Sequence, residues 1–79
     1  MRKDKLMECV DAFAEAMKKK LRKKRREGYS GWDLQENKAG ILQLLSDHVD
    51  SQYYNDANQE VDIANLAMMI WNLNGRKEG

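Results

Sequence analysis

The sequence of 79 residues has no proline, one cysteine, one histidine and one phenylalanine. A single cysteine excludes an internal disulfide framework and is typical of proteins from a reducing compartment. Together with a single histidine, it also excludes a structural zinc site built from these two residue types. The core of such a small domain rarely supplies more than about 3–5 kcal/mol of net stability. With disulfides and zinc excluded, we expect oligomerisation to supply the rest.

The sequence also lacks a long apolar run. The apolar run from Ile63 to Trp71 is about half of the roughly 20 residues that a membrane-spanning helix needs. The N-terminal segment carries Asp4, Glu8 and Asp11 in place of the uninterrupted apolar segment of a signal peptide. We therefore expect a soluble cytoplasmic protein with no membrane partner.

Charge is abundant but unevenly distributed. The formal net charge is +1, yet residues 18–26 contain eight basic side chains in nine positions, whereas residues 33–62 are acidic. A basic stretch of this density can attract phosphate groups, of a nucleotide or of a nucleic acid. Aromatic residues, which single-strand-binding proteins place among their charges for base stacking, are absent from it. Nucleic-acid binding is therefore the less favoured alternative.

The hydrophobic pattern predicts an all-α fold. No alternating β-branched run is present, and three helical segments are expected, at about 5–27, 37–54 and 58–73, followed by a frayed tail at 74–79. Apolar residues spaced three or four apart form one stripe on the first helix, namely Leu6, Val10, Phe13, Met17 and Leu21. The short polar turn between the other two helices implies an antiparallel hairpin. We expect a single domain, a three-helix unit with the hairpin 41–73 as its core, assembled into a homo-oligomeric helical bundle.

Residues 61–71 are apolar on nearly every face, which is the pattern of a helix buried on all sides. Two neighbouring helices cannot cover such a helix entirely, so we predict a homo-oligomer, a dimer or larger, whose interface contains Met68, Ile70 and Trp71. Asp62 and Asn65 interrupt the apolar pattern, three residues apart and therefore on one face. A carboxylate in an apolar setting needs a partner, because an isolated buried charge is strongly unfavourable.

The hairpin is expected to bring further acidic groups to this pair. Asp47 and Asp50 also lie three residues apart, on the preceding helix. Residues equidistant from the turn of a hairpin lie at similar heights, so Asp50 should lie level with Asp62. By the same argument Asp47 should lie level with Asn65. Three carboxylates this close repel one another unless a cation or protons intervene. The pattern predicts a Mg²⁺ site at Asp47, Asp50 and Asp62, because Mg²⁺ prefers oxygen ligands and keeps waters and substrate phosphates.

Side chains from other segments are candidates for holding a nucleotide at this metal. Basic residues of the first helix can hold the phosphates, and Asn65 is a further candidate. The basic candidates are Lys18, Lys20, Lys23, Lys24 and Arg25. Trp32 follows a loop with two glycines and is expected either to stack on a base or to plug the end of the helical unit.

Each of these acidic residues also has a structural interpretation. Acidic residues spaced three apart on a helix are most often solvated, which would account for Asp47 and Asp50. Asp62 would instead be a hydrogen-bond partner of another helix. His48 lies beside the acidic pair but on a different face, and a lone histidine is more often a surface or hydrogen-bonded residue than a site residue.

The run from Glu60 to Ile70 is similar to the last core helix of short, often phage-encoded proteins of the all-α nucleoside triphosphate pyrophosphohydrolase (MazG-like) superfamily. It is particularly similar to those described as dATP/dGTP diphosphohydrolase-like. Gly31-Trp32-Asp33 resembles their Gly-Gly-Trp segment, and the resemblance spans about residues 18–72. It implies Mg²⁺-dependent hydrolysis of a nucleoside triphosphate to a monophosphate and pyrophosphate, in the cytoplasm of an infected bacterial host if a phage encodes the chain.

The metal motif of that superfamily is Glu-x-x-Glu on one helix and Glu-x-x-Asp on the next. Here the two motifs read Asp47-His48-Val49-Asp50 and Gln59-Glu60-Val61-Asp62. Two versions of the function are therefore open: a weak pyrophosphohydrolase, or a degenerate relative that binds a nucleotide without cleaving it. A phage protein that sequesters a signalling nucleotide would be of the second kind. A basic nucleic-acid-binding or protein-interaction module is the remaining alternative.

Overall fold

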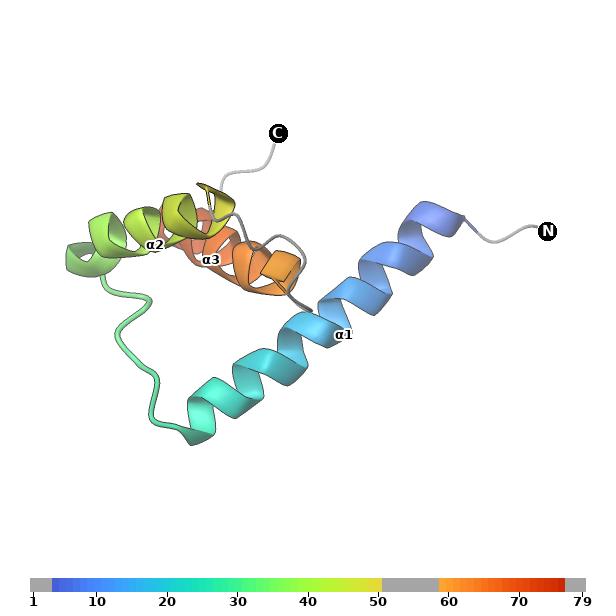
Figure 1. Ribbon diagram of the computed structural model, residues 1–79, viewed down its shortest axis with the longest axis horizontal. Helices are drawn as coiled ribbons and strands as arrows, with labels where there is room; N and C mark the ends of the chain where they lie inside the picture. Colours follow the sequence, from blue (N-terminus) through green and yellow to red (C-terminus); the bar gives the residue numbers. More distant parts are fainter. Residues whose placement is uncertain (1–3, 51–58, 77–79) are drawn as a thin grey trace.

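A computed structural model describes residues 4–50 and 59–76 of the chain. It contains α1 (Lys5–Arg26), a short 3-10 helix η1 (Gln35–Asn37), α2 (Lys38–Asp50) and α3 (Gln59–Leu73). The prediction of an all-α unit in which three helices pack together is confirmed (Figure 1). The expected continuation of the second helix to residue 54 and the polar turn at 55–58 lie outside the described residues. None of the helices within the described ranges has the length and apolar character that a membrane span requires.

The start of α1 is fixed by a side-chain cap. The carboxylate of Asp4 accepts a hydrogen bond of 2.9 Å from the backbone N–H of Leu6, which satisfies one of the free amides at this end. Glu8 lies in the first turn, and four basic residues lie in the last turn, namely Lys23, Lys24, Arg25 and Arg26. Both charge placements are favourable to the helix dipole.

Glycines in the left-handed region terminate α1 and α3 in the same way. Gly28 has φ of +90°, and the N–H of Tyr29 donates to the carbonyl of Lys24 at 3.0 Å. At the end of α3, Gly75 has φ of +87°, and the N–H of Arg76 donates to the carbonyl of Trp71 at 3.0 Å. Both ends have the Schellman arrangement, in which a residue without Cβ turns the chain back onto the last helical turn.

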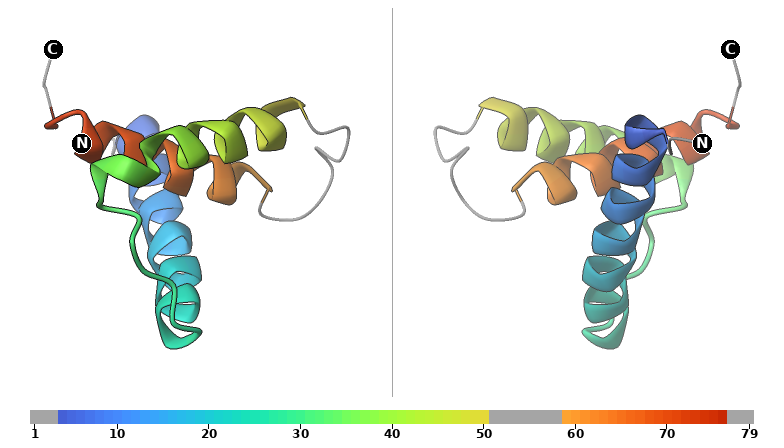
Figure 2. Two further views of the ribbon diagram at one scale, coloured as in Figure 1. Left: turned by 90° about the vertical axis from the view of Figure 1, so that its left-hand side faces the viewer. Right: turned by 90° about the vertical axis from the view of Figure 1, so that its right-hand side faces the viewer.

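The central element is α3, which packs against both α2 and α1 (Figures 1 and 2). The core is small and consists of Ile41, Leu66, Met69 and Leu73. Leu21 of α1 and Trp32 of the connecting segment pack against this core and are half-buried. Of its two predicted roles, base stacking and packing against the helical unit, the described contacts of Trp32 correspond to the second.

The N-terminal half of α1 extends past the α2–α3 hairpin (Figure 1). Only the C-terminal part of its apolar stripe packs against other described elements: Met17 and Leu21 are half-buried. The remaining residues are open, with exposed fractions of 71% for Leu6, 57% for Val10 and 38% for Phe13. Periodicity alone predicted one continuous stripe, but α1 crosses the hairpin steeply, so that the hairpin covers only part of the stripe (Figure 2).

Truncating the core should be far more damaging than the same change on the surface. Met69 is 2% exposed and Met7 is 55% exposed. We predict that Met69→Ala lowers the free energy of unfolding by about 2–5 kcal/mol, because it leaves a cavity among Ile41, Leu66 and Leu73. The matched control Met7→Ala should change it by less than about 0.5 kcal/mol. Urea denaturation followed by circular dichroism measures both, and equal effects would contradict the described core.

Candidate functional site

An ion pair connects α1 to α3 at the point where the two helices pack. Lys20 Nζ lies 3.1 Å from Oδ1 and 3.3 Å from Oδ2 of Asp62, and only the Oδ2 contact has the alignment of a hydrogen bond. The side chains are 33% and 23% exposed, so both charges are partly removed from water. The sequence placed Lys20 among phosphate ligands and Asp62 among metal ligands. In the structure each is the partner of the other.

Asn65 lies one helical turn after Asp62 and is the most deeply buried polar residue described. It is 2% exposed, and its Nδ2 donates a long hydrogen bond of 3.5 Å to the carbonyl of Met17. Within the described residues, nothing donates a hydrogen bond to its Oδ1, nor to Oδ1 of Asp62. An unsatisfied buried acceptor destabilises a protein by about 1–3 kcal/mol. A buried acceptor without a donor in so small a core calls for an explanation, and a bound ligand is one.

These two side chains line a cavity of about 180 Å³ between the three helices. The walls combine polar groups from each helix and the connecting segment with apolar side chains of the core. The lining residues are Lys24, Tyr29, Leu44, His48, Asp62, Asn65, Leu66 and Met69. A small cavity with a few convergent polar groups on largely apolar walls is typical of a small-molecule site.

Tyr29 and Lys24 form one side of this cavity. The Tyr29 hydroxyl donates to Sδ of Met69 at 3.7 Å, and Lys24 Nζ lies 5.4 Å from the centroid of the Tyr29 ring. The second distance is within the range of a cation–π contact. The turn after α1 positions the phenol, since Tyr29 is the first residue after Gly28.

His48 supplies the polar group from α2. Its Nδ1 lies 2.9 Å from the carbonyl of Leu44, and because a carbonyl only accepts, Nδ1 donates this bond and Nε2 is left for another partner. The backbone carbonyl of His48 accepts 3.0 Å from Gln59 Nε2, which ties the start of α3 to α2. His48 is not among the site residues that the sequence predicts. The spacing of Ile41, Leu45 and His48 by four and three residues would have placed it on the inner face.

The predicted group of three carboxylates does not form within the described residues. Asp47 and Asp50 are exposed and do not line the cavity, and Asp47 Oδ1 accepts from Gln43 Nε2 of its own helix at 2.9 Å. No cluster of three or more His, Cys, Asp or Glu side chains in this part of the chain could hold a metal ion. Neighbouring helical residues point about 100° apart. The hairpin therefore brings α2 level with the cavity, as expected. The helix is rotated, however, so that His48 lines the cavity in place of Asp47 and Asp50.

The other predicted phosphate ligands are at the surface of α1. Lys18 pairs with Glu15 of its own helix at 3.6 Å, and Lys23 is exposed. Arg25 lines a surface hollow of about 400 Å³ together with Arg22 and Arg26. Among the five basic candidates, Lys24 alone lines the cavity and Lys20 reaches it through Asp62.

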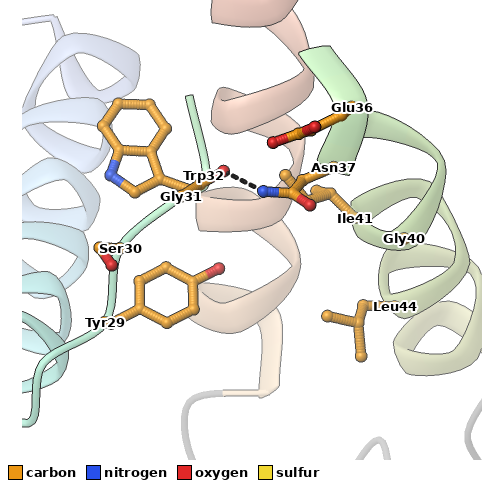
Figure 3. A pocket seen from close by; sticks show the side chains of 9 residues that line it. All are labelled: Tyr29, Ser30, Gly31, Trp32, Glu36, Asn37, Gly40, Ile41 and Leu44. Atoms are coloured by element: carbon orange, nitrogen blue, oxygen red, sulfur yellow. Dashed lines mark hydrogen bonds between the residues drawn. The ribbon is translucent and has the colours of Figure 1, made fainter. Parts of the chain in front are cut away.

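A wider hollow of about 420 Å³ lies on the other side of Tyr29 (Figure 3). The rings of Tyr29 and Trp32 line it from the connecting segment, opposite Leu44 of α2, and Asn37 Nδ2 donates to the Gly31 carbonyl at 2.7 Å. Because Tyr29 and Leu44 line both spaces, the hollow is adjacent to the cavity.

The predicted oligomer contacts differ in exposure. Met68 and Ile70 are half-buried and pack against the core, whereas Trp71 is exposed. Of the three, only the indole of Trp71 is largely available to another chain.

No protein-family model matches the chain, and searches of curated proteins and of solved structures also find no match. The resemblance to MazG-like proteins therefore depends on the residue pattern alone.

Replacing the unsatisfied amide by an apolar side chain should stabilise the free protein. We predict that Asn65→Leu raises the free energy of unfolding by about 1 kcal/mol, because it removes a buried acceptor and the cavity has room for the larger side chain. Asn65→Asp, the matched control, should lower it, because it buries an additional charge. Thermal and urea unfolding measure both changes. A loss of stability in Asn65→Leu would mean that the amide holds the fold together.

Proposed function

We propose that this protein binds a nucleotide, with the base in the cavity beside Asp62 and Asn65 and the phosphates at the basic end of α1. The observation that carries the proposal is the buried Asn65, whose acceptor has no donor among the described residues and which lines a cavity together with Lys24. It is supported by the charge of residues 18–26, which hold eight basic side chains.

The size of the cavity indicates which part of the nucleotide enters it. Drug-sized ligands occupy pockets of roughly 300–1,000 Å³. At about 180 Å³ the cavity can enclose a single ring system but not a whole nucleotide. The sugar and phosphates would then lie outside it, along the surface of the protein.

The charges give the same orientation. The α3 side chains that line the cavity are the carboxylate of Asp62, whose charge would repel a phosphate, and the uncharged amide of Asn65. Lys24 at the cavity and the arginines at the end of α1 are the groups that attract one. An uncharged base therefore fits the inner part, and phosphates fit the outer part.

The proposal is for binding without hydrolysis. Pyrophosphate release in the superfamily that the sequence resembles uses a metal held by four acidic residues, and Asp47 and Asp50 lie away from Asp62. The residues present therefore do not fit Mg²⁺ at this site, and no step through it is proposed. Binding without turnover is what a protein that withholds a nucleotide from other proteins requires.

The basic contact can be tested with a matched pair of lysine variants. Lys24→Ala should weaken binding of a nucleoside triphosphate by about 10–100-fold, because a charge-assisted hydrogen bond contributes about 1.5–3 kcal/mol. Lys19→Ala changes the net charge equally on an exposed residue of the same helix that does not line the cavity, and should have little effect. Isothermal titration calorimetry with ATP, GTP, CTP and UTP, with and without EDTA, measures the affinities.

Three results of that experiment would count against the proposal. Affinity that is lost with EDTA would indicate a metal, and release of pyrophosphate would indicate the enzyme. Equal losses in the two lysine variants, together with a salt-sensitive complex with an oligonucleotide, would favour nucleic-acid binding at the arginine-lined surface of α1.

A further inference from the structure

The N-terminal half of α1 presents an apolar surface that no other described element covers. Leu6 and Val10 are 71% and 57% exposed, and Phe13 is 38% exposed. This half of the helix extends past the α2–α3 hairpin, so α2 and α3 do not reach it (Figure 1). A domain with so small a core needs further burial, and an apolar surface of this kind is typical of a contact with another molecule.

Four charged residues form a row along one side of α1. They are seven positions apart, and all four are exposed: Asp4, Asp11, Lys18 and Arg25. Residues seven apart drift by only about 20° around a helix, so this charged row runs nearly parallel to the helix axis. Its signs are negative, negative, positive and positive. The helix dipole accounts for the two ends of the row but not for Asp11 and Lys18, because its effect falls off within the first and last turns.

The charged row is complementary to itself when the helix is turned end over end. In an antiparallel pair with the twofold axis between positions 14 and 15, Asp4 of one copy lies level with Arg25 of the other. Asp11 then lies level with Lys18, and the twofold axis produces each pair of opposite charges twice. A parallel pair would instead bring residues of the same sign to the same height, which is unfavourable.

The C-terminal half of α1 offers an apolar counterpart beside the basic end of the row. Leu21 lies between Lys18 and Arg25 in the sequence and is half-buried. It lines a hollow of about 190 Å³ whose other lining residues are Arg25, Tyr29, Trp32, Met68 and Met69. In the antiparallel pair Leu21 is level with position 8 of the other helix, between Leu6 and Val10. The register that pairs the charges therefore also brings the exposed apolar residues to the hollow.

We infer that a second copy of the chain covers this surface, in a dimer whose two α1 helices run antiparallel. The exposed apolar residues of each copy lie on the hollow of the other, and the acidic half of each charged row lies beside the basic half of its counterpart. The contact is closed, since each copy gives and receives the same surface. It does not require a bound nucleotide, and it leaves Lys24 at the cavity and Lys20 with Asp62.

Charge reversal tests the register of the pair. Asp11→Lys places two lysines opposite each other, and Lys18→Asp places two aspartates opposite each other. Each should raise the dissociation constant of the dimer by about tenfold or more, because two attractive pairs become two repulsive ones. The double variant exchanges the charges and should return the dissociation constant to within about threefold of the wild-type value. Sedimentation equilibrium at low ionic strength, without nucleotide, measures all four proteins.

Lys19→Asp is the matched control for Lys18→Asp. It makes the same change of charge on an exposed residue of the same helix, about 100° away from the row. It should raise the dissociation constant by less than about threefold, and it should not rescue Asp11→Lys. Circular dichroism of each variant establishes that it is folded.

A second pair of variants tests the apolar contact. Val10→Glu should make the chain monomeric at concentrations where the wild type is a dimer, because it places a charge on the hollow. Ala12→Glu adds the same charge about 160° away around the helix and should leave the dimer intact. A monomeric wild type would overturn the inference. So would a double charge variant that dissociates as readily as the single ones, or a dimer that survives every substitution.

Discussion

An ammonium and a carboxylate that are partly removed from water must remain in contact, because separating them leaves two charges without compensation. Lys20 and Asp62 are such a pair, and they come from helices that are 42 residues apart in sequence. Their contact lies where α1 crosses α3. That crossing places Lys24, one turn further along α1, at the cavity, and directs the Met17 carbonyl towards Asn65. The α1 side of the candidate site is arranged around this crossing.

Because the core is small, each polar group buried at its edge has a large effect on the stability of the fold. Only a few apolar side chains are buried, and α3 nevertheless holds an amide that is 2% exposed and not fully hydrogen-bonded within the described residues. A chain selected for stability alone would gain by an apolar residue there. The ion pair has a structural explanation as a connection between helices. Oδ1 of Asn65 receives no hydrogen bond in the described part of the chain, and this difference is the reason that we base the function on Asn65.

The sequence was sufficient to predict three packed helices, because periodicity and the polar turn indicate the same elements. It also placed Asp62 and Asn65 on one face of α3. It was not sufficient to orient α2, since a rotation by one residue, about 100°, exchanges Asp47 for His48, and the hairpin gives height but not rotation. Nor could the sequence show that the hairpin leaves Leu6 and Val10 exposed, because the apolar pattern of a helix does not identify the element that packs on it.

The turn after α1 has a consequence for how the cavity responds to a bound molecule. One backbone hydrogen bond joins Lys24 to Tyr29 across Gly28, so the ammonium and the phenol that flank the cavity belong to the same terminal turn. Unwinding that turn would displace both groups together. A molecule that contacts both would therefore keep the end of α1 wound, and fraying of that end would release the molecule, so that occupancy and local helicity are thermodynamically linked.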